Sequence, residues 1–220
     1  MPVLSAFGAG SARGFGFSGR TTPSGPTVIG QAFGGGYYAG KINDGGTQYY
    51  LIVAPKATGE NSSKQWKTTQ TSTSGTSSLI DGPTNSANMN DANHPAAQFC
   101  EGLSIGGYSD WYLPAKNELE VMYYFLKPST TANNTSSGSN ANAVSPEPIS
   151  TNYTSGSPGQ TSASAFQTGN SEAFATTDIY WSSTQTSTTA AATQSFSTGN
   201  QTNINKTTVC RVRAVRRIAV

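Results

Sequence analysis

Clusters of apolar positions predict a β-hairpin early in the chain. Residues 37–42 and 48–54 are rich in aromatic and β-branched side chains, and residues 43–46 between them read Asn-Asp-Gly-Gly. Two strand-like runs joined by a short Asn/Gly turn are a strong signal for a hairpin. Residues 55–93 are mostly Ser, Thr, Gly and Asn, so we expect mostly loop there, with Trp66 as a buried anchor.

Helical spacing of apolar positions predicts two helices in the middle of the chain. The first covers residues 95–103, because Pro95 suits a first helical turn and apolar residues follow on one face. The second covers residues 115–126, and Pro128 stops it. Its buried stripe is predicted to consist of Leu119, Met122, Tyr123 and Leu126.

Strand-like patterns return only after a long polar stretch. Residues 129–176 are dominated by Ser, Thr, Asn and Gly, and a loop of that length is uncommon and often functional. Strands are then predicted at residues 178–184, 193–197 and 207–219. We expect the first and last strands of the domain to pair. The order of hairpin, two helices, long loop and antiparallel strands predicts an α+β fold.

Residues 1–36 differ from the rest of the chain. They are rich in Gly, and no helical or alternating period runs through them. Residues 14–19 match GxGxxG, but no strand precedes them and prolines follow, so a dinucleotide site is disfavoured. We interpret residues 1–36 as an arm that a partner subunit holds, and residues 37–220 as the folded domain. The predicted anchors of the arm are Phe7, Phe15, Phe17 and Phe33.

Composition points to a polar but nearly uncharged surface. Hydrophobic residues make up 35% and charged residues 11% of the chain, and the usual charged share is about 25%. Such a surface suits contact with sugars or packing into a large assembly. The net charge of +2 is too weak to imply nucleic acid, and no run approaches the roughly 18 apolar residues of a membrane helix. We therefore expect no nucleic-acid and no membrane partner.

Four arginines crowd the last ten residues, and two interpretations of them stay open. They could line a strand and pair with carboxylates, which we favour, or they could form a patch that binds phosphate or nucleic acid. These arginines are Arg211, Arg213, Arg216 and Arg217.

The residues that usually carry chemistry are few and scattered. His94 is the only histidine and precedes a predicted helix, where capping is its ordinary role. Glu118 and Glu120 are two apart on a helix, so they point in different directions and do not form a catalytic pair. Cys100 and Cys210 allow either one disulfide or two buried thiols. We expect no catalytic residue, no metal site and no cofactor, and hence no enzyme.

Several motifs in a fixed order resemble one bacterial and phage family, the Lcl C-terminal domain. They occupy residues 97–120, 180–184, 196–199 and 212–216, and the likeness extends from about Gly40 to the end of the chain. The resemblance implies a C-type lectin-like fold of the formylglycine-generating-enzyme-like branch. It also implies a binding role, since members resemble adhesins and phage versions look like tail fibres or other virion proteins.

We therefore expect a phage structural protein of a tail fibre, tail tip or baseplate, assembled in the host cytoplasm and released in virions by lysis. Residues 1–7 have no export-signal pattern, and lysis would explain this. The expected partners are other virion subunits, copies of itself (a trimer, by analogy) and a host-surface glycan or protein. A capsid decoration protein and a bacterial adhesin are the alternatives.

The expected recognition face comprises residues 185–192 and 200–205, with Trp181 supporting it from the core. Its candidate ligand-binding residues are Gln185, Thr186, Thr188, Gln194, Asn200 and Asn203.

Overall fold

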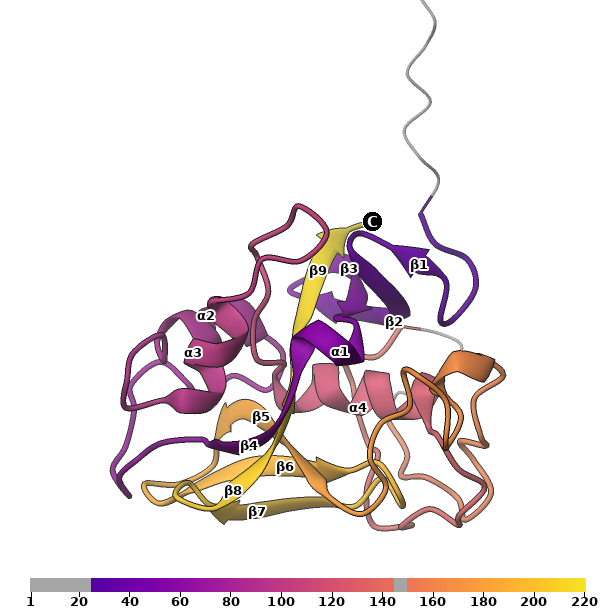
Figure 1. Cartoon of the computed structure of the whole chain (residues 1–220). Helices are drawn as coiled ribbons and strands as arrows, with labels where there is room; N and C mark the ends of the chain where they lie inside the picture. Colours follow the sequence, from indigo (N-terminus) through magenta and orange to yellow (C-terminus); the bar gives the residue numbers. More distant parts are fainter. Residues whose placement is uncertain (1–24, 145–149) are drawn as a thin grey trace, which may run out of the picture.

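The predicted hairpin forms the centre of the first of two sheets in the computed structural model, which describes residues 25–144 and 150–220 (Figure 1). The turn between its strands uses Gly45 and Gly46 at φ 58° and 93°, values that only glycine adopts easily. The strands of this sheet run in the order β1-β2-β3-β9 and pair antiparallel. They are β1 (Ala32–Phe33), β2 (Gly36–Asp44), β3 (Thr47–Val53) and β9 (Val215–Ala219).

The last strand pairs with β3, the second strand of the hairpin, and not with the first predicted strand. Ile52 lies opposite Arg216, and Val53 lies opposite Val215. The early and late parts of the described chain therefore meet in one sheet, as expected, although through a different partner.

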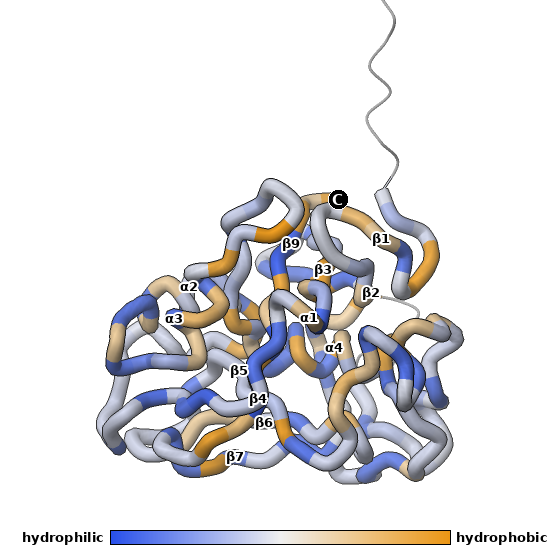
Figure 2. The backbone as a smooth tube through the Cα atoms, viewed as in Figure 1, coloured by the Kyte–Doolittle hydropathy of each residue, from blue (hydrophilic) through white to orange (hydrophobic). Residues whose placement is uncertain are grey.

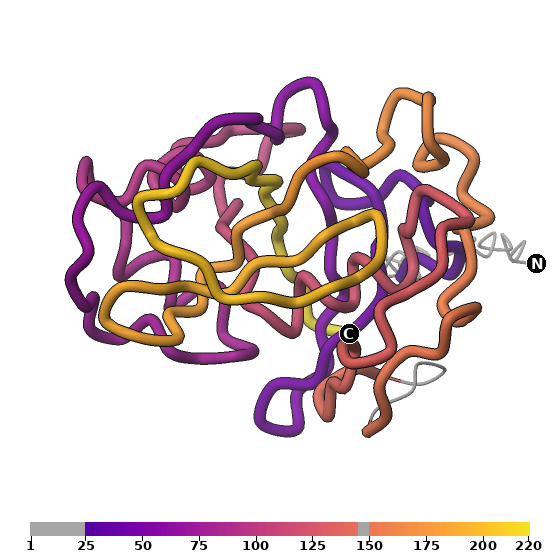
Figure 3. Tube along the Cα trace, turned by 90° about the horizontal axis from the view of Figure 1, so that it is seen from below, coloured from indigo at the N-terminus to yellow at the C-terminus, as the bar shows by residue number. Residues whose placement is uncertain are grey.

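The second sheet has the order β4-β8-β5-β6-β7. In Figure 3 its late segments, orange to yellow, run side by side across the lower face of the molecule. Its pairs are antiparallel except β5 and β8, which run parallel where Tyr180 lies opposite Arg211. Its strands are β4 (Glu60–Gln65), β5 (Ile179–Gln185), β6 (Ala190–Ser195), β7 (Gln201–Asn205) and β8 (Val209–Arg213).

The strand predicted at residues 207–219 is two strands, one in each sheet. Ala214 separates them: its amide donates to the carbonyl of Gly59, and its carbonyl accepts from the amide of Ala54. The β-branched pattern continues through this point, so it could not reveal where the chain passes from one sheet to the other.

The helix α4 (Lys116–Leu126) lies between the two sheets and contacts strands of both (Figure 1). The predicted stripe is buried, and it shares a core with Leu51 and Val53 of the first sheet and Tyr180 of the second. A second core gathers around Trp66, Trp111 and Trp181. Trp66 is a buried anchor, as predicted, and Trp181 lies in the core.

Residues 55–93 contain more regular structure than their loop-like composition indicates. Besides β4, they form α1 (Lys56–Gly59) and α2 (Gly82–Ala87). Asp81 caps the N-terminus of α2, because its carboxylate accepts from the amide of Thr84. The first of the two predicted helices, expected at residues 95–103, is confirmed as α3 (Pro95–Glu101). A 3-10 turn, η1 (Ser164–Phe166), lies in the later polar stretch. Short polar elements of this kind are stabilised by tertiary contacts that leave no periodic pattern.

The polar stretch after α4 is tied to the helix by buried hydrogen bonds in its described parts, residues 129–144 and 150–176. Asn133 Oδ1 accepts from Tyr123 Oη at 2.5 Å and from Lys127 Nζ at 2.7 Å. Lys127 Nζ also donates to the carbonyl of Pro158 at 3.1 Å. This stretch is therefore packed as part of the domain.

The boundary predicted at residue 36 is too late. Residues 25–36 pack on the first sheet, and Phe33 lies in β1 with its ring 6.2 Å from that of Tyr50. Phe33 is therefore an element of the folded domain and not an arm residue. The other predicted anchors, Phe7, Phe15 and Phe17, lie outside the described residues.

Candidate functional site

The arginines near the C-terminus are paired with carboxylates, as we favoured. Arg211 contacts Glu60 and Asp178, and Arg216 makes a two-pronged contact with Asp110 at 2.7 and 2.8 Å. The guanidinium of Arg216 lowers the pKa of Asp110 through these hydrogen bonds. These two side chains are structural, so the alternative of a free phosphate-binding patch loses its main residues.

Arg213 is the most deeply buried of the four, with a fully buried side chain. Its Nη2 donates to Glu172 Oε2 at 2.6 Å, its Nη1 to the carbonyl of Glu172, and its Nε to the carbonyl of Ala54. The guanidinium lies 4.7 Å from the ring centre of Phe174. Arg213 therefore joins β8 to the α1 region and to the polar stretch.

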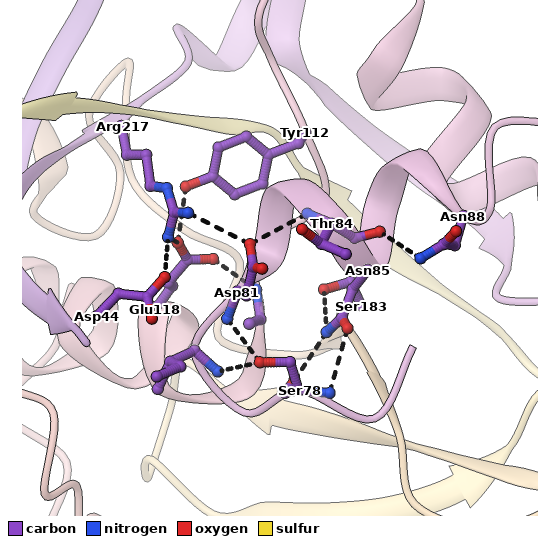
Figure 4. A network of polar contacts seen from close by, with 12 residues as sticks. Asp44, Ser78, Asp81, Thr84, Asn85, Asn88, Tyr112, Glu118, Ser183 and Arg217 are labelled. Atoms are coloured by element: carbon purple, nitrogen blue, oxygen red, sulfur yellow. Dashed lines mark hydrogen bonds and ion pairs between the residues drawn. The ribbon is translucent and has the colours of Figure 1, made fainter. Parts of the chain in front are cut away.

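Arg217 belongs to a polar network that links β9, β2, α2 and α4 (Figure 4). It reaches Asp44 at 3.0 Å and Asp81 at 3.3 Å, and Glu118 lies 4.0 Å away. Glu118 also accepts from Tyr112 Oη at 2.7 Å. Every carboxylate of this network has a structural partner.

The two helix glutamates point apart, as predicted. Glu118 faces this network, whereas Glu120 accepts from Asn140 Nδ2 at 2.6 Å and from Tyr153 Oη at 2.8 Å. Burial raises the pKa of each carboxyl to about 7. Among the described residues, neither the Glu118 nor the Glu120 carboxyl contacts an exposed nucleophilic side chain.

His94 precedes α3, but its side chain does not cap that helix. Its Nδ1 lies 2.8 Å from Asp91 Oδ1, and its Nε2 lies 2.8 Å from Thr73 Oγ1. Burial lowers the pKa of the imidazole. The capping prediction is therefore wrong in detail, and His94 instead supports the loop that contains Thr73.

Cys100 and Cys210 are free thiols, and both are buried in the second core. Of the two possibilities that the sequence left open, the structure has the buried thiols. Within residues 25–144 and 150–220, no cluster of three or more His, Cys, Asp and Glu side chains could hold a metal ion. The same residues contain no helix long and apolar enough to span a bilayer.

The predicted recognition residues divide between the two ends of the second sheet. Gln185, Thr186 and Thr188 lie at the β5–β6 hairpin, where both threonines are exposed. Gln194 and Asn200 lie at the other end of β6.

Gln194 is a correction, because its side chain is 1% exposed and bonds to Tyr153 and Gly199. Asn200 is half-buried and accepts from Asn134. Asn203 is exposed, but it lies on β7, since residues 201–205, predicted as loop, form a strand paired with β6. A polar side chain facing the core cannot be told from an exposed one by its type alone.

Two buried lysines, which the sequence did not single out, hold the hairpin end in place. Lys206 Nζ donates to Gln185 Oε1 at 2.5 Å, to the carbonyl of Thr71 at 3.0 Å and to the carbonyl of Thr188 at 2.9 Å. Its ammonium also lies 4.6 Å from the ring centre of Trp66. Burial, with a smaller effect of Lys67, lowers the pKa of Lys206 to about 8.

Lys67, which follows β4 by two residues, is the second lysine that holds these loops. Its ammonium donates to the carbonyls of Thr71 and Ser72 and to Thr73 Oγ1. Lys67 is 8% exposed and Lys206 is 0% exposed. Together they connect residues 71–73 to the β5–β6 hairpin. Ser72 Oγ also donates to Thr188 Oγ1, which joins the two segments directly.

The surface above these lysines is made of exposed hydroxyl and amide side chains. Residues 68–72 and 186–189 are all exposed, and neither segment contains a charged side chain. We call these two segments the hydroxyl loops. They are rigidly supported neutral donors and acceptors, which can bind a polar ligand but offer no acid, base or nucleophile set.

The sequence motifs in α3, α4, β5 and β8 are the ones that resemble a known protein family. The Lcl C-terminal domain family matches residues 57–216. The chain belongs to this family. No curated protein matches the chain.

The family match includes both hydroxyl loops and the paired arginines up to Arg216. It begins after β3, although β3 pairs with β9 along five residues. In this member of the Lcl C-terminal domain family, the hairpin of residues 36–53 therefore completes a sheet whose last strand begins inside the matched range and ends beyond it.

Proposed function

We propose that this protein is a phage virion structural protein of a tail fibre, tail tip or baseplate, and that its domain has a C-type lectin-like fold that binds the host surface. The observation that carries the proposal is the pair of hydroxyl loops, which are exposed, uncharged and fixed from below by Lys67 and Lys206. A rigid polar rim of this kind suits recognition, because little side-chain and loop freedom is lost on binding.

The fold part of the proposal is supported by the arrangement of elements. The early hairpin and the last strand share one sheet, one long helix lies between the two sheets, and long irregular segments are held by buried polar contacts. Membership of the Lcl C-terminal domain family agrees with this interpretation.

The proposed ligand face overlaps only in part with the face that the sequence predicts. It comprises the hydroxyl loops, including Thr186 and Thr188, and leaves out Gln194, which is buried. Neutral hydroxyls and amides bind a glycan weakly at a single site, so repeated copies on a virion would supply the strength through avidity. Host-surface glycan is therefore the ligand class that we propose.

The first experiment locates the protein. Gold-labelled antibodies are applied to purified virions, and label on the tail is the expected result. Label on the head would favour the alternative of a capsid decoration protein. Absence of the chain from virions would contradict both.

The second experiment tests the ligand face. The double variant Thr186→Ala and Thr188→Ala removes two exposed hydroxyls without touching the backbone carbonyl that binds Lys206. Each lost hydrogen bond is worth about 1 kcal/mol, so we expect binding to host cells to fall by about tenfold or more. Thr131→Ala, an exposed threonine in the polar stretch, is the matched control. Unchanged adsorption of the double variant would refute this ligand face.

A further inference from the structure

Lys127 is a buried amine that no carboxylate of the described residues contacts. It follows α4 directly, and its side chain is 1% exposed. Its hydrogen bonds go to Asn133 Oδ1 at 2.7 Å and to the carbonyl of Pro158 at 3.1 Å, and both acceptors are neutral. Because burial disfavours the charged form, the pKa of Lys127 is lowered. A desolvated lysine of this kind can act as a nucleophile in its neutral form.

The side-chain amide of Asn133 is held with its carbonyl oxygen toward this amine. Its Oδ1 accepts from Lys127 Nζ and from Tyr123 Oη, whereas its Nδ2 donates to the carbonyls of Thr154 and Pro158, each at 3.0 Å. The reverse orientation would place the NH₂ group against two donors and the oxygen against carbonyls, so the hydrogen bonds fix the amide in this one. Asn133 is only 7% exposed, so water competes little for these groups.

The amine lies within reach of the carbonyl carbon of this amide. The hydrogen bond of 2.7 Å from Lys127 Nζ to Asn133 Oδ1, with a C=O bond of about 1.2 Å, places Nζ roughly 3–4 Å from Cγ. Reacting atoms in a preorganised site are about 3–3.5 Å apart. The carbonyl of Pro158 accepts from both groups, from the amine at 3.1 Å and from the amide at 3.0 Å, so it holds them side by side.

Tyr123 supplies a donor at the atom where negative charge develops when an amine attacks this amide. Its hydroxyl donates to Asn133 Oδ1 at 2.5 Å, and burial raises its pKa, so the hydroxyl keeps its proton. Its ring contacts the rings of Tyr153 and Phe196, with centres 5.4 and 5.7 Å away, which fixes its position. A fixed donor at a carbonyl oxygen stabilises the tetrahedral intermediate of such an attack.

We propose that Lys127 and Asn133 join in an intramolecular amide bond, with Tyr123 stabilising the reacting carbonyl oxygen. The neutral Nζ bonds to Asn133 Cγ, and the bond between Cγ and Nδ2 breaks. One proton of Nζ passes to Nδ2, which leaves as ammonia, so atoms and electrons balance and no further reactant is needed. The proposal concerns the scaffold and is independent of the proposed function.

This bond ties the start of the polar stretch to the end of α4. Residues 129–140 consist of Ser, Thr, Asn and Gly apart from Ala132, so they carry no large apolar side chain that could anchor them. In Figure 2 the loops beside the end of α4 are largely white and blue, in agreement with this composition. A covalent link at Asn133 holds a segment that hydrophobic packing does not.

The test is mass spectrometry of the purified full chain, which should be lighter than its sequence by one ammonia. Chymotrypsin cuts after Leu126 and Tyr153 and releases residues 127–153 as one peptide. Fragmentation of this peptide should give no ions from cleavage between residues 127 and 133, because the new bond closes a ring there. A chain with the mass of its sequence would overturn the proposal. So would loss of ammonia with these fragments present, since a succinimide at Asn133 gives that result.

Three variants assign the bond and the role of the hydroxyl. Lys127→Met should abolish the ring, and Asn134→Ala, which changes the neighbouring amide, should keep it; a ring that survives the first or is lost in the second would overturn the pairing. Tyr123→Phe keeps the aromatic ring and removes only the hydroxyl, so the linked chain should accumulate about a hundredfold more slowly during cell-free synthesis. Tryptophan fluorescence shows that each variant is folded, because Trp66, Trp111 and Trp181 are buried. Linking of folded Tyr123→Phe at the rate of the unchanged chain would contradict the role of the hydroxyl.

Discussion

Arg213 offers the sharpest test of the buried polar framework. In the variant Arg213→Met the side chain keeps much of its apolar length but loses all its donors. Three hydrogen bonds disappear, two to Glu172 and one to the carbonyl of Ala54, and the carboxylate of Glu60 loses a charge 3.7 Å away. The side chains of Glu172 and Glu60 are only 10% and 4% exposed, so water cannot replace the guanidinium freely.

The expected cost follows from this burial. Breaking a buried ion pair by removing one partner costs about 3–5 kcal/mol, because an uncompensated charge stays behind. For a chain of this size each kcal/mol lowers the melting temperature by about 2–4 °C. We therefore expect Arg213→Met to lower the free energy of unfolding by about 3–5 kcal/mol and the melting temperature by roughly 6–20 °C.

Urea unfolding followed by tryptophan fluorescence measures this cost, because Trp66, Trp111 and Trp181 are buried. The matched control is Asp178→Asn, which removes a partner of Arg211 that is 46% exposed and should cost less than about 1 kcal/mol. A loss for Arg213→Met as small as that of the control would refute the reasoning.

A double variant identifies the source of the cost. Adding Glu172→Gln to Arg213→Met removes the stranded carboxylate, so it should recover about 1 kcal/mol or more. A purely additive loss would mean that packing against Phe174, and not the ion pair, dominates.

Three further predictions concern other buried groups. Burial raises the pKa of the Glu120 carboxyl from 4.5 to about 7, so its contribution to stability is present below about pH 4.5 and is lost as the pH rises through about 7. Glu120→Gln should therefore reduce the loss of unfolding free energy between pH 5 and pH 8 by about 2–3 kcal/mol. An unchanged pH profile would contradict this. Lys206→Met should increase hydrogen exchange at residues 71–73 and 186–189 by about tenfold or more while α4 stays protected, because the hydrogen bonds of Lys206 to Thr71, Thr188 and the neighbouring Gln185 are lost. Burial raises the pKa of Cys100 and raises that of Cys210 to about 12, so a thiol reagent at pH 8 should label neither in the folded protein and both in urea; rapid labelling without denaturant would be inconsistent with the structure.

The sequence by itself determined the elements whose evidence is local. The hairpin around Gly45 and Gly46 follows from turn chemistry, and α4 follows from an apolar stripe that ends before a proline. The pairing of the C-terminal arginines with carboxylates was also predictable, since many basic side chains on strands of a nearly uncharged protein need partners. The family, too, was recognisable from short motifs in a fixed order.

Only the tertiary structure decided which polar residues are buried and which are exposed. Gln194 and Asn203 both carry an amide, yet Gln194 lies in the core and Asn203 faces outward, because an amide side chain can occupy either face of a strand. The support of the hydroxyl loops by Lys206 was also missed. One signal could have indicated it: Lys206 is the only charged residue between Ile179 and Cys210.

The division of residues 207–219 between two sheets was decided in the same way. The backbone of Ala214 bonds to Gly59 and Ala54, which are about 155 residues away in the chain. Local patterns report only whether a segment is extended and apolar. The partners that a strand, a lysine or an amide finds are fixed by contacts between distant segments, and these exist only once the whole domain has folded.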